Sequence, residues 1–337
     1  MNPNFSAAAI SPEASLLTAL SKGIIRFPGF DSTMLRKNPL SSPATAKGHL
    51  DQVRQGMRNT AIPDAELFDS DVTLHPPCRP CSSSRATVAV KIIPFSDMRY
   101  TDLTGLYPIQ AKSGHQYLLI MLSCNYILLE PMRSRDQAEF VNAYSRGTDF
   151  FTCHGISPQH EQLNNETFRS LERYFATHEP RIHIQDVSPH NHRANIAVRA
   201  IRTWKNHFIS ILSTVDPTFP LDVWDLLLPQ SELTINLLRS SYFCPHTSAW
   251  HALHGSYNFN HEPIAPPRIR ITCFETPLQR ASWAPHGIDG NYVGPSFNHH
   301  RCFKVHLPRT GASRDTAQRG IHPLYTHYPE HPHMTTS

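Results

Sequence analysis

The stretch from Pro189 to Leu212, read with its leading Ser188 as SPHNHRANIAVRAIRTWKNHFISIL, constrains the fold more than any other part of the chain. Its apolar residues recur at helical spacing, which predicts a long helix with one face packed against a sheet. That face consists of Ala197, Ala200, Ile201, Trp204, Phe208 and Ile211. The opposite face carries Arg199, Arg202 and Lys205, Arg193 precedes it, and no Asp or Glu lies in the stretch. Such a face suits a polyanion, although a solvated cationic surface on a core helix is the commoner case.

The charge of the chain is uneven. The 31 Lys and Arg residues face 27 acids, so the net charge of +4 does not by itself indicate a nucleic-acid-binding protein. Between Pro263 and Arg319, however, eight Lys or Arg residues stand against three acids. Positive charge is therefore concentrated in the central helix and the C-terminal third.

The composition also bears on the compartment. Seven cysteines, an odd number, and an N-terminus without the basic lead and apolar core of a secretory signal predict reduced thiols in an intracellular protein. The nucleus and a cytoplasmic particle both stay open as locations of the protein. No apolar run approaches the roughly 18 residues that a membrane-spanning helix needs, so no membrane partner is expected.

The first 97 residues predict an irregular or helical extension. A short helix is expected near Ser15–Leu20 and an exposed basic helix over Lys47–Thr60. Cys78 and Cys81 form a Cys-x-x-Cys pair, which is half of a structural zinc site. His49 and His75 are further ligand candidates, but neither belongs to a paired motif, so two thiols in a Pro-rich loop is the simpler interpretation and zinc stays open.

Residues 98–239 predict a mixed α/β core. Apolar or alternating runs predict five strands, and amphipathic stretches between them predict helices on both faces of the sheet. The expected strands are Tyr100–Leu103, Gln116–Ser123, Tyr126–Glu130, Gln159–Asn164 and Arg181–Val187. A helix is expected to be capped at Ser134, and another, Leu221–Leu238, to be kinked at Pro229.

The rest of the chain predicts a small β-rich module and a tail. Short β-like runs occur at Ile269–Phe274, Gly290–Val293 and Cys302–Leu307. The module is expected to occupy residues 240–315, with Trp283 packing it together. The His- and Pro-rich residues 316–337 are expected to be disordered.

Several motifs, taken in order, resemble the integrase region of LTR-retrotransposon polyproteins. They are TDLTG at 101–105, LNNE at 163–166, PHNHRANIAVRAIRTWKNHF at 189–208, LPQSELTINLLR at 228–239, and APPR…WAPHGIDGNYVGPSFNHHRCF at 265–303. KGHLDQVRQGMRNT at 47–60 is similar to the segment that precedes this core, so the resemblance covers about residues 47–315. It implies a ribonuclease-H-like fold with a mixed five-stranded sheet, an SH3-like C-terminal module, binding of DNA ends, and action as a homo-oligomer.

The resemblance also implies a site and shows where this chain departs from it. The family holds two Mg²⁺ or Mn²⁺ ions with two Asp and one Glu, for an in-line displacement at phosphorus. Asp102 fills the first position, whereas Asn164 occupies the second Asp position and Val198 the Glu position. Since Val offers no ligand and Asn no charge, we expect weakened metal binding and a catalytically impaired copy.

Other residues bear on this site. The carboxylate of Glu166 is a possible replacement ligand, because residues i and i+2 of a strand share a face. By the same resemblance His192 and Arg193 contact DNA, together with Arg199, Arg202 and Lys205.

Three alternatives stay open. The main one is a non-catalytic nucleic-acid-binding or assembly module that acts through charge and shape. A metal-dependent nuclease on the same fold needs the same carboxylates and is weakened by the same losses. A Cys–His hydrolase can be assembled on paper from Cys153 and one of 22 histidines, but nothing in the sequence places one beside the thiol.

Overall fold

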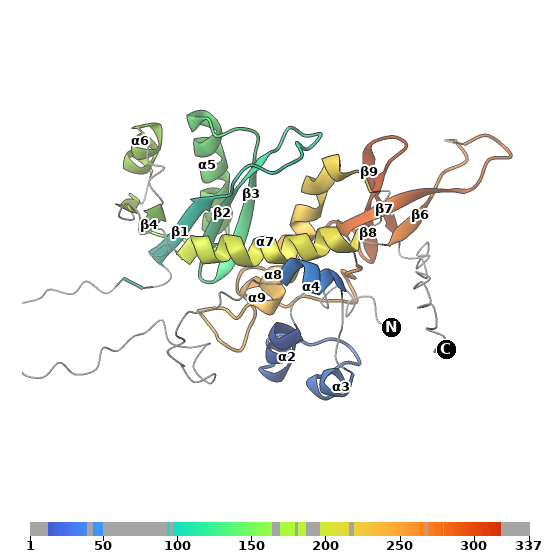
Figure 1. The fold of residues 1–337 in the computed structure, drawn as a ribbon, viewed down its shortest axis with the longest axis horizontal. Coiled ribbons are helices and arrows are strands. Elements are labelled where there is room, and N and C mark those ends of the chain that lie inside the picture. Colours follow the sequence, from blue (N-terminus) through green and yellow to red (C-terminus); the bar gives the residue numbers. More distant parts are fainter. Residues whose placement is uncertain are drawn as a thin grey trace, which may run out of the picture. The chain divides into compact units, whose positions relative to one another are not determined.

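A computed structural model of the chain describes residues 13–38, 43–49, 93–94, 97–163, 169–178, 181–186, 196–215, 219–266, 269–278 and 280–317. Met1–His49 together with Pro94–Ser337 form one compact unit, and Leu50–Ile93 form a second. All the helices and strands below belong to the first unit (Figure 1).

The central element is a mixed five-stranded sheet with the order β3-β2-β1-β4-β5. Its strands are β1 (Met98–Leu103), β2 (Tyr117–Ser123), β3 (Tyr126–Met132), β4 (His160–Leu163) and β5 (His183–Asp186). The first three strands are antiparallel neighbours, and β4 and β5 continue the sheet from β1 in parallel. The predicted α/β fold with a mixed five-stranded sheet is confirmed, and this topology is consistent with a ribonuclease-H-like core.

Helices cover both faces of this sheet, and each face has its own apolar core. On one face α7 (Ile196–Thr214) packs through the predicted apolar face, Ala200, Ile201, Trp204, Phe208 and Ile211, onto Leu118, Ile120 and Leu122 of β2. On the other face α5 (Gln137–Cys153) and α6 (Arg169–Thr177) enclose a core with Leu119, Met121 and Leu163. The strand period of two explains the division, since successive residues of β2 enter opposite cores.

In the described residues, a 3₁₀ helix and two α-helices follow α7. The chain passes through a 3₁₀ helix, η3 (Leu221–Leu227), into α8 (Leu228–Leu238), which packs against α7 and β3. The expected kink at Pro229 is wrong. The break lies earlier, at Val223 with φ −120°, and Pro229 sits in the first turn of α8, where its missing N–H costs no helical hydrogen bond. The short helix α9 (Ala249–His254) follows α8.

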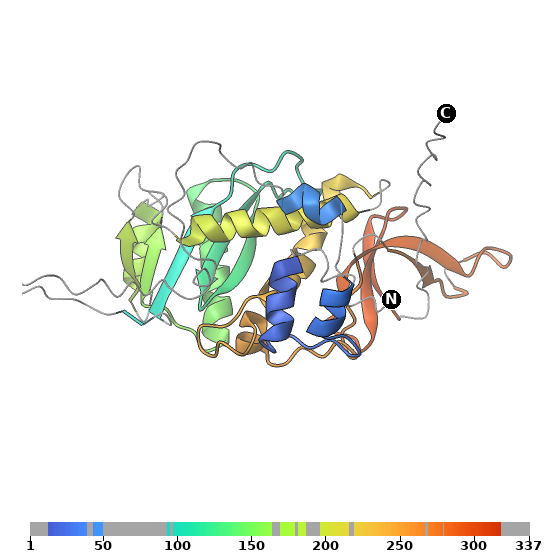
Figure 2. The same ribbon diagram turned by 60° about the horizontal axis from the view of Figure 1, so that its bottom comes forward.

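The described residues of the N-terminal part include the short helices α2 (Glu13–Ser21), α3 (Ser32–Lys37) and α4 (Pro43–His49). Both ribbon views place α4 alongside α7 (Figures 1 and 2). Gly48 permits this close approach, because a Cβ atom there would lie 2.7 Å from the backbone nitrogen of Ser210. Only the first three residues of the predicted Lys47–Thr60 helix are described, as the end of α4. Cys78, Cys81 and His75 lie outside the described residues.

The C-terminal module is a four-stranded antiparallel sheet with the order β6-β7-β8-β9. Its strands are β6 (Arg270–Phe274), β7 (Gly287–Pro295), β8 (Cys302–Leu307) and β9 (Ala312–Ala317). A hydrogen bond of 2.8 Å from the Gln230 side chain to the Ala265 carbonyl links α8 to the segment leading into it. The predicted β-rich module is present, but Trp283 does not pack it together, because its side chain is 98% exposed.

Two further expectations are corrected. The residue before α5 is Asp136, so Ser134 does not cap this helix, and its hydroxyl instead donates to the Asp136 carboxylate at 2.6 Å. Strand β9 was not expected, because ASRDTA carries no apolar period. None of the described helices is long and apolar enough to span a membrane.

Candidate functional site

Asp102 lies on β1 near the strand's C-terminal end, paired in register with Ile120 of β2. Tyr100, two residues earlier on the same strand, packs into the core beneath α7. Because residues i and i+2 of a strand share a face, Asp102 belongs to the sheet face that α7 covers. Its side chain is half-buried, and its Oδ1 accepts a hydrogen bond of 3.0 Å from the N–H of Leu103. A carboxylate therefore stands at the edge of the core and not in a solvent-exposed turn.

The second carried-over position is only partly framed by the structure. Strand β4 ends at Leu163, which pairs with Thr101, the residue before Asp102. Asn164 follows Leu163 in the chain, but it lies outside the described residues, as do Glu166, His192 and Arg193.

The third position, Val198, is in the first turn of α7. Its side chain is half-buried beside the buried Ala197, and α7 packs against β1, the strand of Asp102. The predicted helix and the predicted strand are therefore neighbours. At this position the chain presents a hydrocarbon, which neither accepts a proton nor binds a cation.

The residues present do not fit a two-metal centre. Of the three carried-over positions, Asp102 alone is a carboxylate, whereas hard divalent cations take several anionic or carbonyl oxygens. No group of three or more His, Cys, Asp or Glu among the described residues is arranged to hold a metal ion. We therefore derive no catalytic step through Mg²⁺ or Mn²⁺ in this chain.

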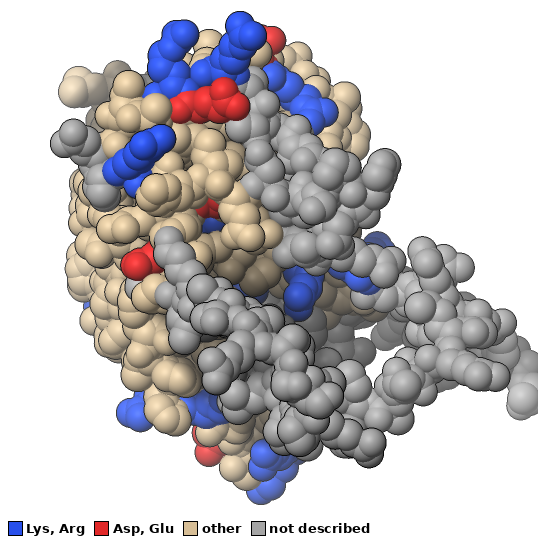
Figure 3. Space-filling view, turned by 90° about the vertical axis from the view of Figure 1, so that its left-hand side faces the viewer, with Lys and Arg blue, Asp and Glu red and all other residues tan. Residues whose placement is uncertain are grey.

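The basic face of α7 forms as predicted. Arg199, Arg202 and Lys205 are exposed on the helix, on the side opposite to the buried Ala200, Ile201 and Trp204. Beside Lys205, the segment Thr104–Ile109 and α7 enclose a mainly apolar cavity of about 330 Å³ that begins two residues after Asp102. In the view of Figure 3, Lys and Arg side chains gather at the upper and lower margins of the face shown.

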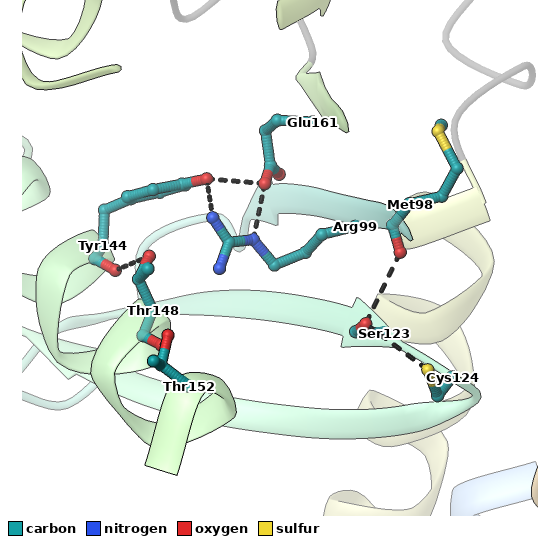
Figure 4. Close-up of polar contacts among 8 residues, drawn as sticks. All are labelled: Met98, Arg99, Ser123, Cys124, Tyr144, Thr148, Thr152 and Glu161. Atoms are coloured by element: carbon teal, nitrogen blue, oxygen red, sulfur yellow. Dashed lines mark hydrogen bonds and ion pairs between the residues drawn. The ribbon is translucent and has the colours of Figure 1, made fainter. Parts of the chain in front are cut away.

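Beneath the opposite face of β1, sequence reasoning missed a buried ion pair (Figure 4). Arg99 Nε and Glu161 Oε2 are 2.5 Å apart with both side chains inaccessible to solvent, and the Tyr144 hydroxyl from α5 contacts both. Burial raises the pKa of Glu161, and the charge of Arg99 opposes that rise. Burial would lower the pKa of Arg99, but the charge of Glu161 and the hydrogen bonds outweigh it, so the pKa is raised.

This pair joins β1 to β4 three residues before Asp102 and Asn164 in the sequence. Arg99 and Glu161 are register partners across the two parallel strands. The available signal was an acid, Glu161, inside one expected strand and a base, Arg99, directly before another. Starting the first strand at Tyr100 left Arg99 outside it and hid that signal.

Two groups of residues have the residue types of a hydrolase active site but not its geometry. Ser113 Oγ lies 2.7 Å and Asp225 Oδ2 3.1 Å from the same ring nitrogen, Nδ1, of His115, whereas a catalytic triad needs one partner on each nitrogen. Cys153 is exposed at the end of α5, and none of the described histidines hydrogen-bonds its thiol. Neither arrangement supports nucleophilic catalysis.

Comparison with known proteins gives structural likenesses at low identity. No family model matches the sequence, and no curated protein matches it. A chain of the cryo-EM structure of the simian T-cell lymphotropic virus intasome in complex with PP2A regulatory subunit B56 gamma is 15% identical, with a TM-score of 0.34, over 69% of this chain and 83% of that one. The HTLV-2 integrase catalytic core domain in complex with magnesium is 16% identical, with a TM-score of 0.33, over 45% of this chain and 96% of that one. Likenesses with such low identities and TM-scores carry no argument about function. A functional proposal for this chain depends on its own residues and on its sheet order.

Proposed function

We propose that this protein is an integrase-like protein of an LTR retrotransposon, and that it binds DNA ends but is impaired in strand transfer. The supporting observation is the arrangement around one sheet face. The motif residue Asp102 lies on β1, α7 packs on the same face, and the outer side of α7 exposes Arg199, Arg202 and Lys205. By the sequence resemblance, the β6–β9 module is SH3-like and also contacts DNA, and the protein acts as a homo-oligomer.

The impairment follows from the donor set. Two of three ligand positions carry Asn164 and Val198, so the negative charge that offsets cation dehydration is largely missing. Loss of such ligands removes several kcal/mol of transition-state stabilisation, which corresponds to orders of magnitude in rate. DNA binding through Lys and Arg is unaffected by this loss, since counterion release depends on the number of phosphates neutralised.

The DNA-binding part is tested by the salt dependence of duplex affinity. The triple variant Arg199→Gln, Arg202→Gln, Lys205→Gln should bind more weakly, and its log–log salt slope should fall by up to about three relative to the wild type. A matched control is Arg26→Gln, Arg36→Gln, Lys37→Gln, which removes the same charge from exposed positions of the N-terminal part.

Equal effects of the two triple variants would mean that the interaction follows net charge and not the α7 face. In that case the face is a solvated surface on a core helix. DNA binding by the wild type without measurable strand transfer is also the result that the non-catalytic binding module predicts. The repair of the carboxylates, described in the Discussion, separates a decayed enzyme from a protein built only to bind.

A further inference from the structure

A cavity of about 640 Å³ lies beside the edge strand β3, between α5, α8, α9 and the segment that follows α9. None of its lining residues belongs to β1 or α7, so it is separate from the candidate site described above. Its volume is within the range of small-ligand sites in proteins. Among the described residues, its lining combines aromatic rings with carboxylates and includes no Lys or Arg. On a chain of net charge +4, that lining has the opposite sign to the protein as a whole.

The aromatic wall is centred on Trp250. Its ring centroid lies 6.5 Å from that of Tyr126, 6.2 Å from that of Tyr257 and 6.0 Å from that of Phe297. His254 stacks on Trp250 at 4.0 Å, which helps to fix the indole. The π faces of Trp, Tyr and Phe attract cations, and the attraction grows when the cation is partly removed from water.

The acidic component is centred on Glu232. Its Oε1 accepts a hydrogen bond of 2.8 Å from the Tyr126 hydroxyl, and its Oε2 accepts one of 3.0 Å from the N–H of Leu129. Each carboxylate oxygen has further acceptor capacity, and the side chain lines the cavity. Burial raises the pKa of Glu232 to about 7, with the two hydrogen bonds acting in the opposite direction. A cation in the cavity would offset that cost of burying the carboxylate.

Further acids surround the same space. Glu130, Asp225 and Glu262 also line the cavity. Arg146 pairs with Glu130 at 2.9 Å but is not itself part of the lining, and His261 lies 3.6 Å from Glu262. The lining is therefore complementary to a positively charged group with an apolar stem, which can lie against the rings while its head faces the carboxylates.

We propose that this cavity binds the cationic side chain of a basic peptide segment, a lysine ammonium or an arginine guanidinium. The acidic lining favours a cationic group, and the exposed rim of the cavity favours a ligand that is part of a peptide. Ser256, Asn258 and Phe297 at the rim are exposed, so a peptide backbone can cross the opening while one side chain enters. This site is independent of the proposed DNA binding.

Calorimetric titration of the full chain with matched probes tests the ligand class. The cationic probes are the peptide acetyl-Gly-Gly-Lys-Gly-Gly-amide, its arginine counterpart and n-butylammonium. The neutral peptides carry norleucine in place of lysine and citrulline in place of arginine. We expect the two cationic peptides to bind at least about ten-fold more tightly than their neutral versions. Equal binding of the neutral peptides, or no binding of any cationic probe at millimolar concentration, would overturn the proposal. Butylammonium binding as tightly as the lysine peptide would assign the cavity to a free organic cation instead and would overturn the peptide assignment.

Matched variants test the location. Phe297→Ala, at the rim, should weaken binding of the lysine peptide by about five-fold or more, whereas Phe274→Ala, at an exposed position on β6, should leave it unchanged. Glu262→Gln should weaken binding, and the exposed Glu172→Gln on α6 should not. All four positions are at least partly exposed, so folding should be retained, and thermal melts verify this. Equal affinities across the four variants would overturn the assignment to this cavity.

Discussion

Asn236 of α8 hydrogen-bonds both backbone groups of Ile127 on the edge strand β3. Its Oδ1 accepts from the Ile127 N–H at 2.9 Å, and its Nδ2 donates to the Ile127 carbonyl at 2.8 Å. One turn earlier on the same helix, Glu232 accepts from the N–H of Leu129. The side chains of α8 thus occupy the hydrogen-bonding groups that a further strand would otherwise use. This closes an edge that would be open to pairing with another chain.

Replacing Asn236 should therefore destabilise the protein strongly, although the substitution removes only a small side chain. Asn236→Ala leaves the buried N–H and carbonyl of Ile127 without partners, and we expect a loss of about 2–4 kcal/mol in the free energy of unfolding. Asn236→Asp restores the acceptor but places a carboxylate against the carbonyl, so it should not rescue. Chemical denaturation measures both, with the exposed Asn142→Ala on α5 as control. A loss below about 0.5 kcal/mol for Asn236→Ala would show that the contact does not hold the edge.

The Arg99–Glu161–Tyr144 cluster makes a second prediction. Arg99→Met leaves the fully buried Glu161 without its cation, which should cost about 3–5 kcal/mol in the free energy of unfolding. The triple variant Arg99→Met, Glu161→Met, Tyr144→Phe removes the stranded charge and the stranded hydroxyl together. It should be more stable than Arg99→Met alone. A triple variant no more stable than the single one would show that packing, and not the uncompensated carboxylate, sets the cost.

The pH dependence of Arg99→Met adds a test of the cause. Burial already raises the pKa of Glu161, and losing Arg99 raises it further. An acid whose pKa is raised in the folded state binds its proton more readily there than in the unfolded chain, so stability increases as the pH falls. The deficit of Arg99→Met relative to wild type should therefore shrink between pH 8 and pH 5. Arg309→Met, which removes the exposed partner of Glu275, is the control and should cost less than about 1 kcal/mol.

His207 predicts a separate loss of stability in acid. The His207 ring is buried, and its Nε2 shares a hydrogen bond of 2.7 Å with Thr234 Oγ1, which also lies 2.8 Å from the Gln230 carbonyl. Burial lowers the pKa of His207 to about 3, with the charge of His49 acting in the same direction. Below about pH 6.5 the unfolded chain takes up a proton that the folded chain refuses, so unfolding becomes easier as the pH falls toward 3.

The measurement is a comparison of variants over that pH range. His207→Gln lacks the titrating group, so its stability relative to wild type should improve steadily from pH 6.5 to pH 4. His246→Gln, at an exposed position, should track the wild type throughout. A constant difference between His207→Gln and wild type would show that His207 is protonated in the folded protein as readily as in the unfolded chain.

Local apolar periodicity explains which elements could be predicted from the sequence. The helix was recognised because Ala200, Trp204 and Phe208 repeat at its spacing, and the same residues form its buried face in the structure. Strand β9 could not be recognised, because it is an edge strand with mostly exposed polar side chains and is held by backbone pairing to β8. The β2–β3 turn, in contrast, fills the two-residue gap between the expected strands Gln116–Ser123 and Tyr126–Glu130, although its residues do not carry the usual turn signal. Cys124 and Asn125 adopt φ of 51° and 68°, a geometry for which Asn-Gly is the usual sequence signal.

The candidate site was predictable only as far as resemblance and strand periodicity reach. Asp102 was placed correctly on a strand, and its assignment to the face of α7 needed the sheet register. Contacts such as that of Asn236 with Ile127 join residues 109 positions apart, and no local pattern encodes them. The cavity beside β3 depends on several elements that are distant in sequence, so its aromatic and acidic residues appeared unrelated before the fold was known.

The last prediction concerns repair of the catalytic positions. If the chain is a decayed integrase, the double variant Asn164→Asp, Val198→Glu should acquire strand-transfer activity that depends on Mg²⁺ or Mn²⁺, whereas the wild type should show none. Asp102→Ala in the double-variant background should abolish the gained activity, because the family's centre needs all three carboxylates. A strand-transfer assay with a labelled DNA end measures each protein at equal concentration.

The control is Thr203→Glu combined with Asn164→Asp. Thr203 is exposed on α7, so this pair adds the same charges to the same helix but not at the position carried over from the family. Activity of the variant with Val198→Glu, but not of the variant with Thr203→Glu, would mean that the geometry around Asp102 is retained although two ligands have been lost. Equal inactivity of the two pairs, with DNA binding intact, would favour a protein that acts by binding alone. Activity of the unaltered chain that is lost on Asp102→Ala would contradict the impairment itself, since one carboxylate would then be sufficient.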